Sequence, residues 1–135
     1  MLKELGTVKI GPTEDTSCFV NAVISEVAFD KLANYIDEAR SSKDCEIVFG
    51  GTYDKSKGYY ITPTVILTSN PKYITMCEEL FGPVLTIFLY EELNEELFKL
   101  IDTSSNYALT GAIFSQNRYT IEKAIHALNY SAGNL

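Results

Sequence analysis

Apolar residues recur along this chain at two spacings, which predict helices and strands in alternation. Between residues 26 and 40 they fall three and four positions apart, as on the buried face of an amphipathic helix. Ser25 precedes this segment and is its predicted N-cap. The same spacing predicts two further helices, over 91–102 and over 118–130.

Other segments are rich in β-branched and aromatic residues and are predicted to be extended: 45–49, 59–67, 83–90 and 108–115. The run at 83–90 is apolar at nearly every position, which is typical of a strand covered by helices on both faces. Strands and helices alternate over the second half of the chain. This alternation indicates an α/β fold, with a mostly parallel sheet flanked by helices.

The composition is that of an ordinary globular protein. The chain has 135 residues, of which 46% are hydrophobic and 21% charged. This length is enough for one domain and too short for two. The net charge is −7 and the lysines are scattered, which disfavours nucleic acid and anionic membranes as partners. No apolar run reaches the roughly 20 residues that a membrane span needs.

Few residues in the chain are suited to nucleophilic, acid–base or metal chemistry. Cys18, Cys45 and Cys77 lack the close spacing of a zinc or redox motif, so we expect reduced thiols and no metal site. His126 is the single histidine. It lies beside the apolar face of the last predicted helix, and we expect it to be a partly buried structural residue.

The last five residues also carry information about domain organisation. Gly133 and Asn134 are typical of a helix terminator, and Leu135 has the character of the first residue of a further strand. On this pattern we expect residues 1–135 to form a single partial domain.

A seven-residue motif connects the chain with a known family. Residues 78–84 read EELFGPV, which strongly resembles a signature of the aldehyde dehydrogenase superfamily. Upstream, GYYITPTV at 58–65 is similar to a stretch that precedes this signature in the family. Downstream, 106–114 resembles the family's Tyr-Gly-Leu-Thr strand, and Ala132 to Asn134 resemble the start of its Gly-Asn strand.

Within the superfamily, the wording is most similar to the Δ1-pyrroline-5-carboxylate dehydrogenase branch, also called L-glutamate γ-semialdehyde dehydrogenase. YALTGAIFSQ at 107–116, SAGN at 131–134 and NAVI at 21–24 are typical of that branch. The resemblance covers essentially the whole chain. It implies a fragment from the later, C-terminal portion of an aldehyde dehydrogenase catalytic domain.

The resemblance implies an NAD-dependent oxidoreductase of proline catabolism that oxidises L-glutamate γ-semialdehyde to L-glutamate. In the family a cysteine attacks the aldehyde, a hydride passes to NAD, and a glutamate activates the water that releases the acid. The motifs of that cysteine and that glutamate do not occur in this sequence. We therefore expect no catalytic residue within the chain, and no activity of the chain alone.

Two residues of the motif match positions that hold the cofactor in the family. Glu79 matches the glutamate that accepts hydrogen bonds from the nicotinamide ribose. Phe81 matches the aromatic residue that packs beside the nicotinamide. An ionised carboxylate suits two hydroxyl donors, and an aromatic wall restricts the ring to one face. Read from composition alone, Glu79 is instead a surface charge and Phe81 a core residue.

Two alternatives remain open at this stage. One is a free-standing, non-catalytic interaction module related to an aldehyde dehydrogenase. The other is a fragment of a different semialdehyde dehydrogenase. The choice between NAD and NADP is also open, since the residues that contact the adenosine ribose lie outside the sequence. The family further implies a small aldehyde substrate and a homo-oligomer. It implies the mitochondrial matrix if the source is eukaryotic, and otherwise the cytoplasm.

Overall fold

The computed structural model describes residues 1–133, so the predicted strand start at Leu135 lies outside the described residues. The chain folds into two compact units. The first comprises residues 1–70 and 80–88, and the second comprises 71–79 and the residues from Leu89 onward. The prediction that residues 1–135 form a single partial domain stays a prediction.

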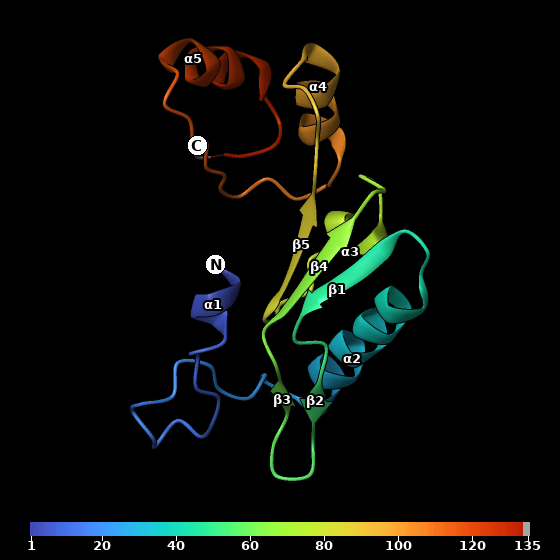
Figure 1. The fold of residues 1–135 in the computed structure, drawn as a ribbon, viewed down its shortest axis with the longest axis vertical. Coiled ribbons are helices and arrows are strands. Elements are labelled where there is room, and N and C mark those ends of the chain that lie inside the picture. Colours follow the sequence, from blue (N-terminus) through green and yellow to red (C-terminus); the bar gives the residue numbers. More distant parts are fainter. Residues whose placement is uncertain (134–135) are drawn as a thin grey trace. The chain divides into compact units, whose positions relative to one another are not determined.

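Along the described residues, two helices are followed by four strands, a helix, a strand and two further helices (Figure 1). Their bounds are α1 Leu2–Leu5, α2 Glu26–Ser41, β1 Cys45–Phe49, β2 Tyr53–Asp54, β3 Tyr60–Ile61, β4 Thr64–Thr68, α3 Ile74–Cys77, β5 Val84–Phe88, α4 Glu95–Thr103 and α5 Arg118–Ala127. The α/β class predicted from the sequence is confirmed.

A three-stranded sheet in the order β1-β4-β5 is the centre of the first unit. Strands β4 and β5 are parallel, with Thr64 opposite Val84. Strands β1 and β4 are antiparallel, and the hairpin β2–β3 lies between them in sequence. The sheet is therefore mixed in orientation. Leu85 on β5 is about half exposed, so the described residues do not cover both faces of that strand.

Helix α2 packs along this sheet and supplies most of the core (Figure 1). Its N-cap is Ser25 as predicted, since the Ser25 side chain accepts a hydrogen bond from the Ala28 backbone N–H at 3.2 Å. The apolar face of the helix is fully buried. The residues of this core cluster are Phe29, Leu32, Ala33, Ile36, Ile61 and Leu80.

The outer side of α2 is tied to the β2–β3 hairpin by polar contacts. Lys55 in the hairpin turn pairs with Glu26 at 3.2 Å and with Asp30 at 3.1 Å. The Tyr53 hydroxyl donates to Asp37 at 2.6 Å. These contacts tie the hairpin to three positions of the helix, while the opposite face of the helix packs in the core.

The second unit contains helices but no strand among its described residues. Helix α4 begins after Asn94, whose side chain caps it, and not at residue 91 as predicted. Helix α5 follows Asn117, which caps it in the same way. The prediction of a strand over 108–115 is wrong, because no other strand of the described residues pairs with this segment. His126 is exposed, contrary to expectation.

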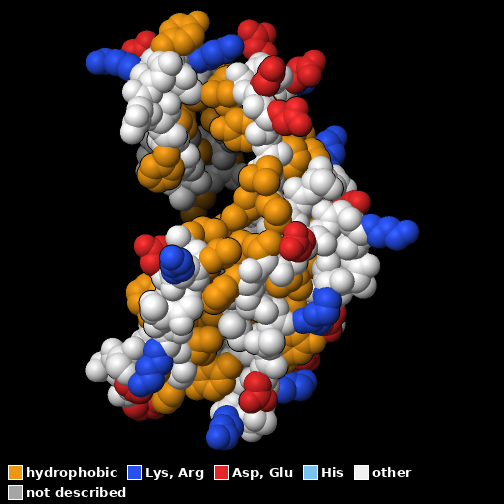
Figure 2. All heavy atoms as spheres, viewed as in Figure 1, with side chains coloured by type: hydrophobic (Ala, Val, Ile, Leu, Met, Phe, Trp, Pro, Cys, Tyr) orange, Lys and Arg blue, Asp and Glu red, His pale blue; other side chains and the backbone are white. Residues whose placement is uncertain are grey.

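Apolar side chains remain on the surface of the first unit. Figure 2 shows them gathered over the region of β4 and β5, with charged side chains mostly at the margins. In the part of the chain that the structure describes, no helix is both long and apolar enough to cross a membrane.

Candidate functional site

The EELFGPV segment connects α3 to β5, and the chain passes from the second unit into the first within it, between Glu79 and Leu80. Glu78 terminates α3: its backbone is extended, and its N–H donates to the Ile74 carbonyl at 2.9 Å. Glu79 follows as the last residue of its stretch of the second unit, with an exposed side chain. The motif therefore presents a carboxylate to solvent directly after a short helix.

Phe81 has an unusual backbone conformation. Its φ is 55°, and it is the only residue other than glycine with a positive φ in the described part of the chain. For a residue with a Cβ atom, this left-handed conformation costs about 1–2 kcal/mol. The ring is also 82% exposed. The aromatic side chain thus lies in solvent in spite of a conformational cost. Residues with strained backbone conformations of this kind concentrate at functional sites.

The neighbours of Phe81 account for this conformation. Leu80 is only 9% exposed and belongs to the core cluster. On the other side, the Pro83 carbonyl accepts the Thr64 N–H at 2.8 Å, and the Val84 N–H turns back to the Gly82 carbonyl at 2.7 Å. The backbone is thus fixed on both sides of residue 81. Phe81 lies between a buried anchor, Leu80, and the two residues that lead into β5.

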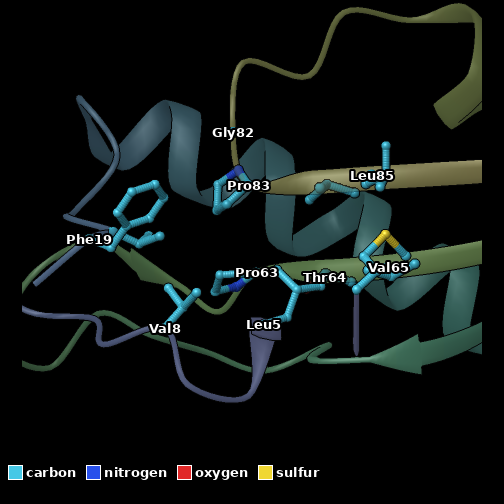
Figure 3. A pocket seen from close by; sticks show the side chains of 12 residues that line it. Leu5, Val8, Phe19, Pro63, Thr64, Val65, Gly82, Pro83 and Leu85 are labelled. Atoms are coloured by element: carbon cyan, nitrogen blue, oxygen red, sulfur yellow. The ribbon is translucent and has the colours of Figure 1, made fainter. Parts of the chain in front are cut away.

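An apolar groove lies beside this turn in the first unit (Figure 3). Its volume is about 290 Å³. Residues of α1, of the segment around Phe19 and of the first parts of β4 and β5 line it. No charged side chain is among the lining residues. The groove can take up apolar surface, but it contains no group suited to proton transfer.

The cysteines do not add a nucleophile to this site. Cys18, Cys45 and Cys77 are all free thiols and partly buried. Burial raises the pKa of the Cys18 thiol, and the Asp15 carboxylate beside it raises it further, which disfavours the reactive thiolate. Among residues 1–133, no group of three potential metal ligands comes together.

In the structure, the side chains of the two predicted residues, Glu79 and Phe81, are both exposed to solvent. They belong to different compact units, so each is described within its own unit. Sequence reasoning missed the left-handed conformation of Phe81. It also missed the close packing of Gly82 on Leu32 of α2, because that contact joins residues fifty positions apart. The glycine itself was the only local signal.

Comparison with known proteins assigns the whole chain to one family. The model of the aldehyde dehydrogenase family matches residues 1–135. The chain belongs to the aldehyde dehydrogenase family. The resemblance seen in the EELFGPV motif is thereby confirmed, and the α/β fold agrees with the aldehyde dehydrogenase structures that the chain resembles.

Within the aldehyde dehydrogenases, the chain is similar to proteins named Δ1-pyrroline-5-carboxylate dehydrogenase. It is 48% identical to the mitochondrial protein of Dictyostelium discoideum over 95% of this chain, and 46% identical to that of Danio rerio over 94%. The chain spans about a quarter of the length of these relatives, 23% in both cases.

A solved structure gives the same result. The Mycobacterium tuberculosis Δ-pyrroline-5-carboxylate dehydrogenase bound with NAD and cobalamin superimposes with a TM-score of 0.88 at 34% identity. The match covers 98% of this chain and 24% of that one. The resemblance to this branch, stated from the sequence, is therefore supported by both sequence and structure.

Proposed function

We propose that this chain forms the nicotinamide-facing part of an NAD-dependent dehydrogenase that oxidises L-glutamate γ-semialdehyde to L-glutamate. The observation that carries the proposal is Phe81 in the EELFGPV motif, held at φ 55° with its ring 82% exposed. An exposed apolar ring held at a conformational cost is suited to a ligand. The names of the relatives, and the NAD in the Mycobacterium tuberculosis structure, supply the chemistry.

Glu79 is proposed to bind the ribose next to the nicotinamide. Its carboxylate is exposed and can accept hydrogen bonds from two neighbouring hydroxyls. Hydrogen bonds to a charged acceptor are worth roughly 1.5–3 kcal/mol each. The residue would therefore both retain the cofactor and fix the rotation of its nicotinamide end.

Phe81 is proposed to pack against the nicotinamide and to keep it at one angle to the substrate. Positioning of this kind lowers the entropic part of a reaction barrier. NAD, when bound, supplies the hydride acceptor. The residues of this chain bind and orient it, while the nucleophile and the water-activating base come from outside these 135 residues. The chain alone is therefore proposed to be inactive.

Further properties of the whole protein follow from its relatives. The substrate would be a small aldehyde, and the assembly a homo-oligomer, as is typical of aldehyde dehydrogenases. The Dictyostelium and Danio relatives are named mitochondrial, so we place a eukaryotic form of this protein in the mitochondrial matrix.

A chimera tests the proposal. Residues 1–135 replace the matching segment of the Danio rerio relative, and NAD reduction is followed with glutamate γ-semialdehyde as substrate. We expect a turnover within about tenfold of the parent enzyme, and a clear loss with Phe81→Ala. The control is Tyr119→Ala, which removes an exposed aromatic ring elsewhere in the chain. A chimera with the parent's circular dichroism and oligomeric state, but without NAD reduction, would contradict the proposal.

A further inference from the structure

The packing of Gly82 on helix α2 is unusually close. A Cβ atom on Gly82 would lie 2.8 Å from Cδ2 and 3.1 Å from Cγ of Leu32, and closer still to its Cδ1. All three of its nearest neighbours are atoms of this one side chain. Leu32 is fully buried, so it cannot swing into solvent to make room. The backbone at Gly82 can therefore approach α2 only because residue 82 has no side chain.

This close approach has a consequence for the residue before it. Leu80 is buried in the same cluster as Leu32, so the chain is held against α2 on both sides of Phe81. Phe81 must complete the turn between these two fixed points, and it does so at φ 55°. With Leu80 and Gly82 both held inward, the ring of Phe81 points out into solvent.

The geometry points to Leu32 as a positioning residue for Phe81: its buried side chain is the surface on which Gly82 rests, and this contact maintains the left-handed turn. Leu32 is far from solvent and touches no ligand. The inference rests on the proposed role of Phe81 at the nicotinamide for its effect on catalysis. Its structural part, the control of the Phe81 backbone by Leu32, is independent of that role.

Two substitutions allow a test at constant volume. Gly82→Ala adds one methyl group where there is no room, and Leu32→Val removes one carbon from the side chain that fills the space. The double variant therefore has the same number of carbon atoms at the contact as the original chain. If the contact positions Phe81, the second substitution rescues the first.

Controls separate positioning from general destabilisation. Ile36→Val removes one carbon from an equally buried residue one turn further along α2. It should not rescue Gly82→Ala. Gly6→Ala adds a methyl group at a glycine whose Cβ would have only ordinary contacts, the nearest at 3.4 Å from the Lys3 carbonyl. It should leave every measurement unchanged.

The first measurement is the Phe81 backbone in the 135-residue chain, by NMR. A strong nuclear Overhauser effect between the amide and α protons of one residue indicates a positive φ. We expect this signal in the original chain, at least a twofold weakening in Gly82→Ala, and its return in the double variant. If Gly82→Ala does not fold, Leu32→Val alone decides, because it loosens the contact and should weaken the signal. An undiminished signal in the single variants, or rescue by Ile36→Val, overturns the inference.

The second measurement is NAD reduction in the Danio rerio chimera. Gly82→Ala should raise KM for NAD and lower kcat, with a loss of at least tenfold in kcat/KM, and Leu32→Val should restore it to within about threefold. An unsubstituted chimera that is folded but inactive would count against the proposed function, while the NMR result still decides the role of Leu32. A correct NMR pattern without the kinetic rescue in an active chimera would overturn the catalytic part of the inference.

Discussion

Replacing Phe81 by glycine and by alanine should reverse the usual order of stability of these two residues. Within a helix or strand, a protein with glycine is usually less stable than the same protein with alanine, by roughly 0.5–1 kcal/mol. At φ 55°, a residue with a Cβ atom costs about 1–2 kcal/mol, and glycine avoids this cost. The difference leaves Phe81→Gly more stable than Phe81→Ala by about 0.5–1 kcal/mol.

The lost ring does not disturb this comparison, because both variants lose it. The ring is 82% exposed, so less than a fifth of its roughly 200 Å² is buried, or about 40 Å². At about 25 cal/mol per Å² its removal costs about 1 kcal/mol. For Phe81→Gly this loss and the relief of strain nearly cancel. Its free energy of unfolding should therefore lie within about 1 kcal/mol of that of the original chain.

Urea denaturation of the 135-residue chain, followed by circular dichroism, measures these differences as shifts of the unfolding midpoint. The matched control is Asn34, an exposed position within α2. At that position the alanine variant should have a free energy of unfolding about 1 kcal/mol higher than that of the glycine variant, as in helices generally. If Phe81→Ala is the more stable of the pair at residue 81, the residue is not held in the strained conformation, and the reasoning fails.

Three further predictions concern charge, pH and assembly. In the active enzyme, Glu79→Gln should lower kcat/KM for NAD on the order of tenfold, a loss of roughly 1–2 kcal/mol of transition-state stabilisation, and should raise the kinetic isotope effect measured with a deuterated aldehyde. An equal effect of Glu78→Gln in the same kinetics would contradict the assignment. The Lys9 ammonium, with two hydrogen bonds from Ser17, holds the pKa of Asp15 well below its ordinary 3.8. The ionised Asp15 carboxylate therefore stabilises the fold fully above about pH 4, and this contribution declines as the pH falls further. The difference in melting temperature between the original chain and Asp15→Asn should narrow from pH 7 to pH 2. A constant difference would refute this. Because β5 is an edge strand of its sheet and lies beside exposed apolar residues, the chain should self-associate; sedimentation showing a 15.1 kDa monomer at all concentrations would contradict it.

The elements that the sequence predicted well are those with local causes. Helix α2 combines a helical apolar pattern with a capping serine, and both signals lie within its own residues. Strand β1 was predicted within its actual bounds, Cys45–Phe49. Helix α4 begins after Asn94 and not at residue 91, since the side chain of Asn94 provides the cap that the earlier glutamates do not.

The errors concern features that depend on distant partners. Residues 108–115 have a strand-like composition, but a strand also needs a neighbour, and composition does not supply one. For Phe81, the sequence indicated a role but not a shape. Its conformation is set by Leu80 and Gly82, which pack on a helix fifty positions earlier. No pattern within the motif encodes that contact.

The layout of the first unit also has a consequence for the order of folding. Helix α2 and the antiparallel pair β1–β4 come from one continuous stretch, 25–68, in which β1 follows closely on α2. Strand β5 joins β4 in parallel after the chain has crossed 69–83. The pairing spans a sequence distance similar to that of β1 with β4, but parallel pairing is intrinsically slow to form. We expect pulsed hydrogen exchange during refolding to protect amides of β1 before those of β5; simultaneous protection would contradict this order. The EELFGPV motif would then pack against helix α2 after that helix has folded, and the left-handed turn at Phe81 would form last.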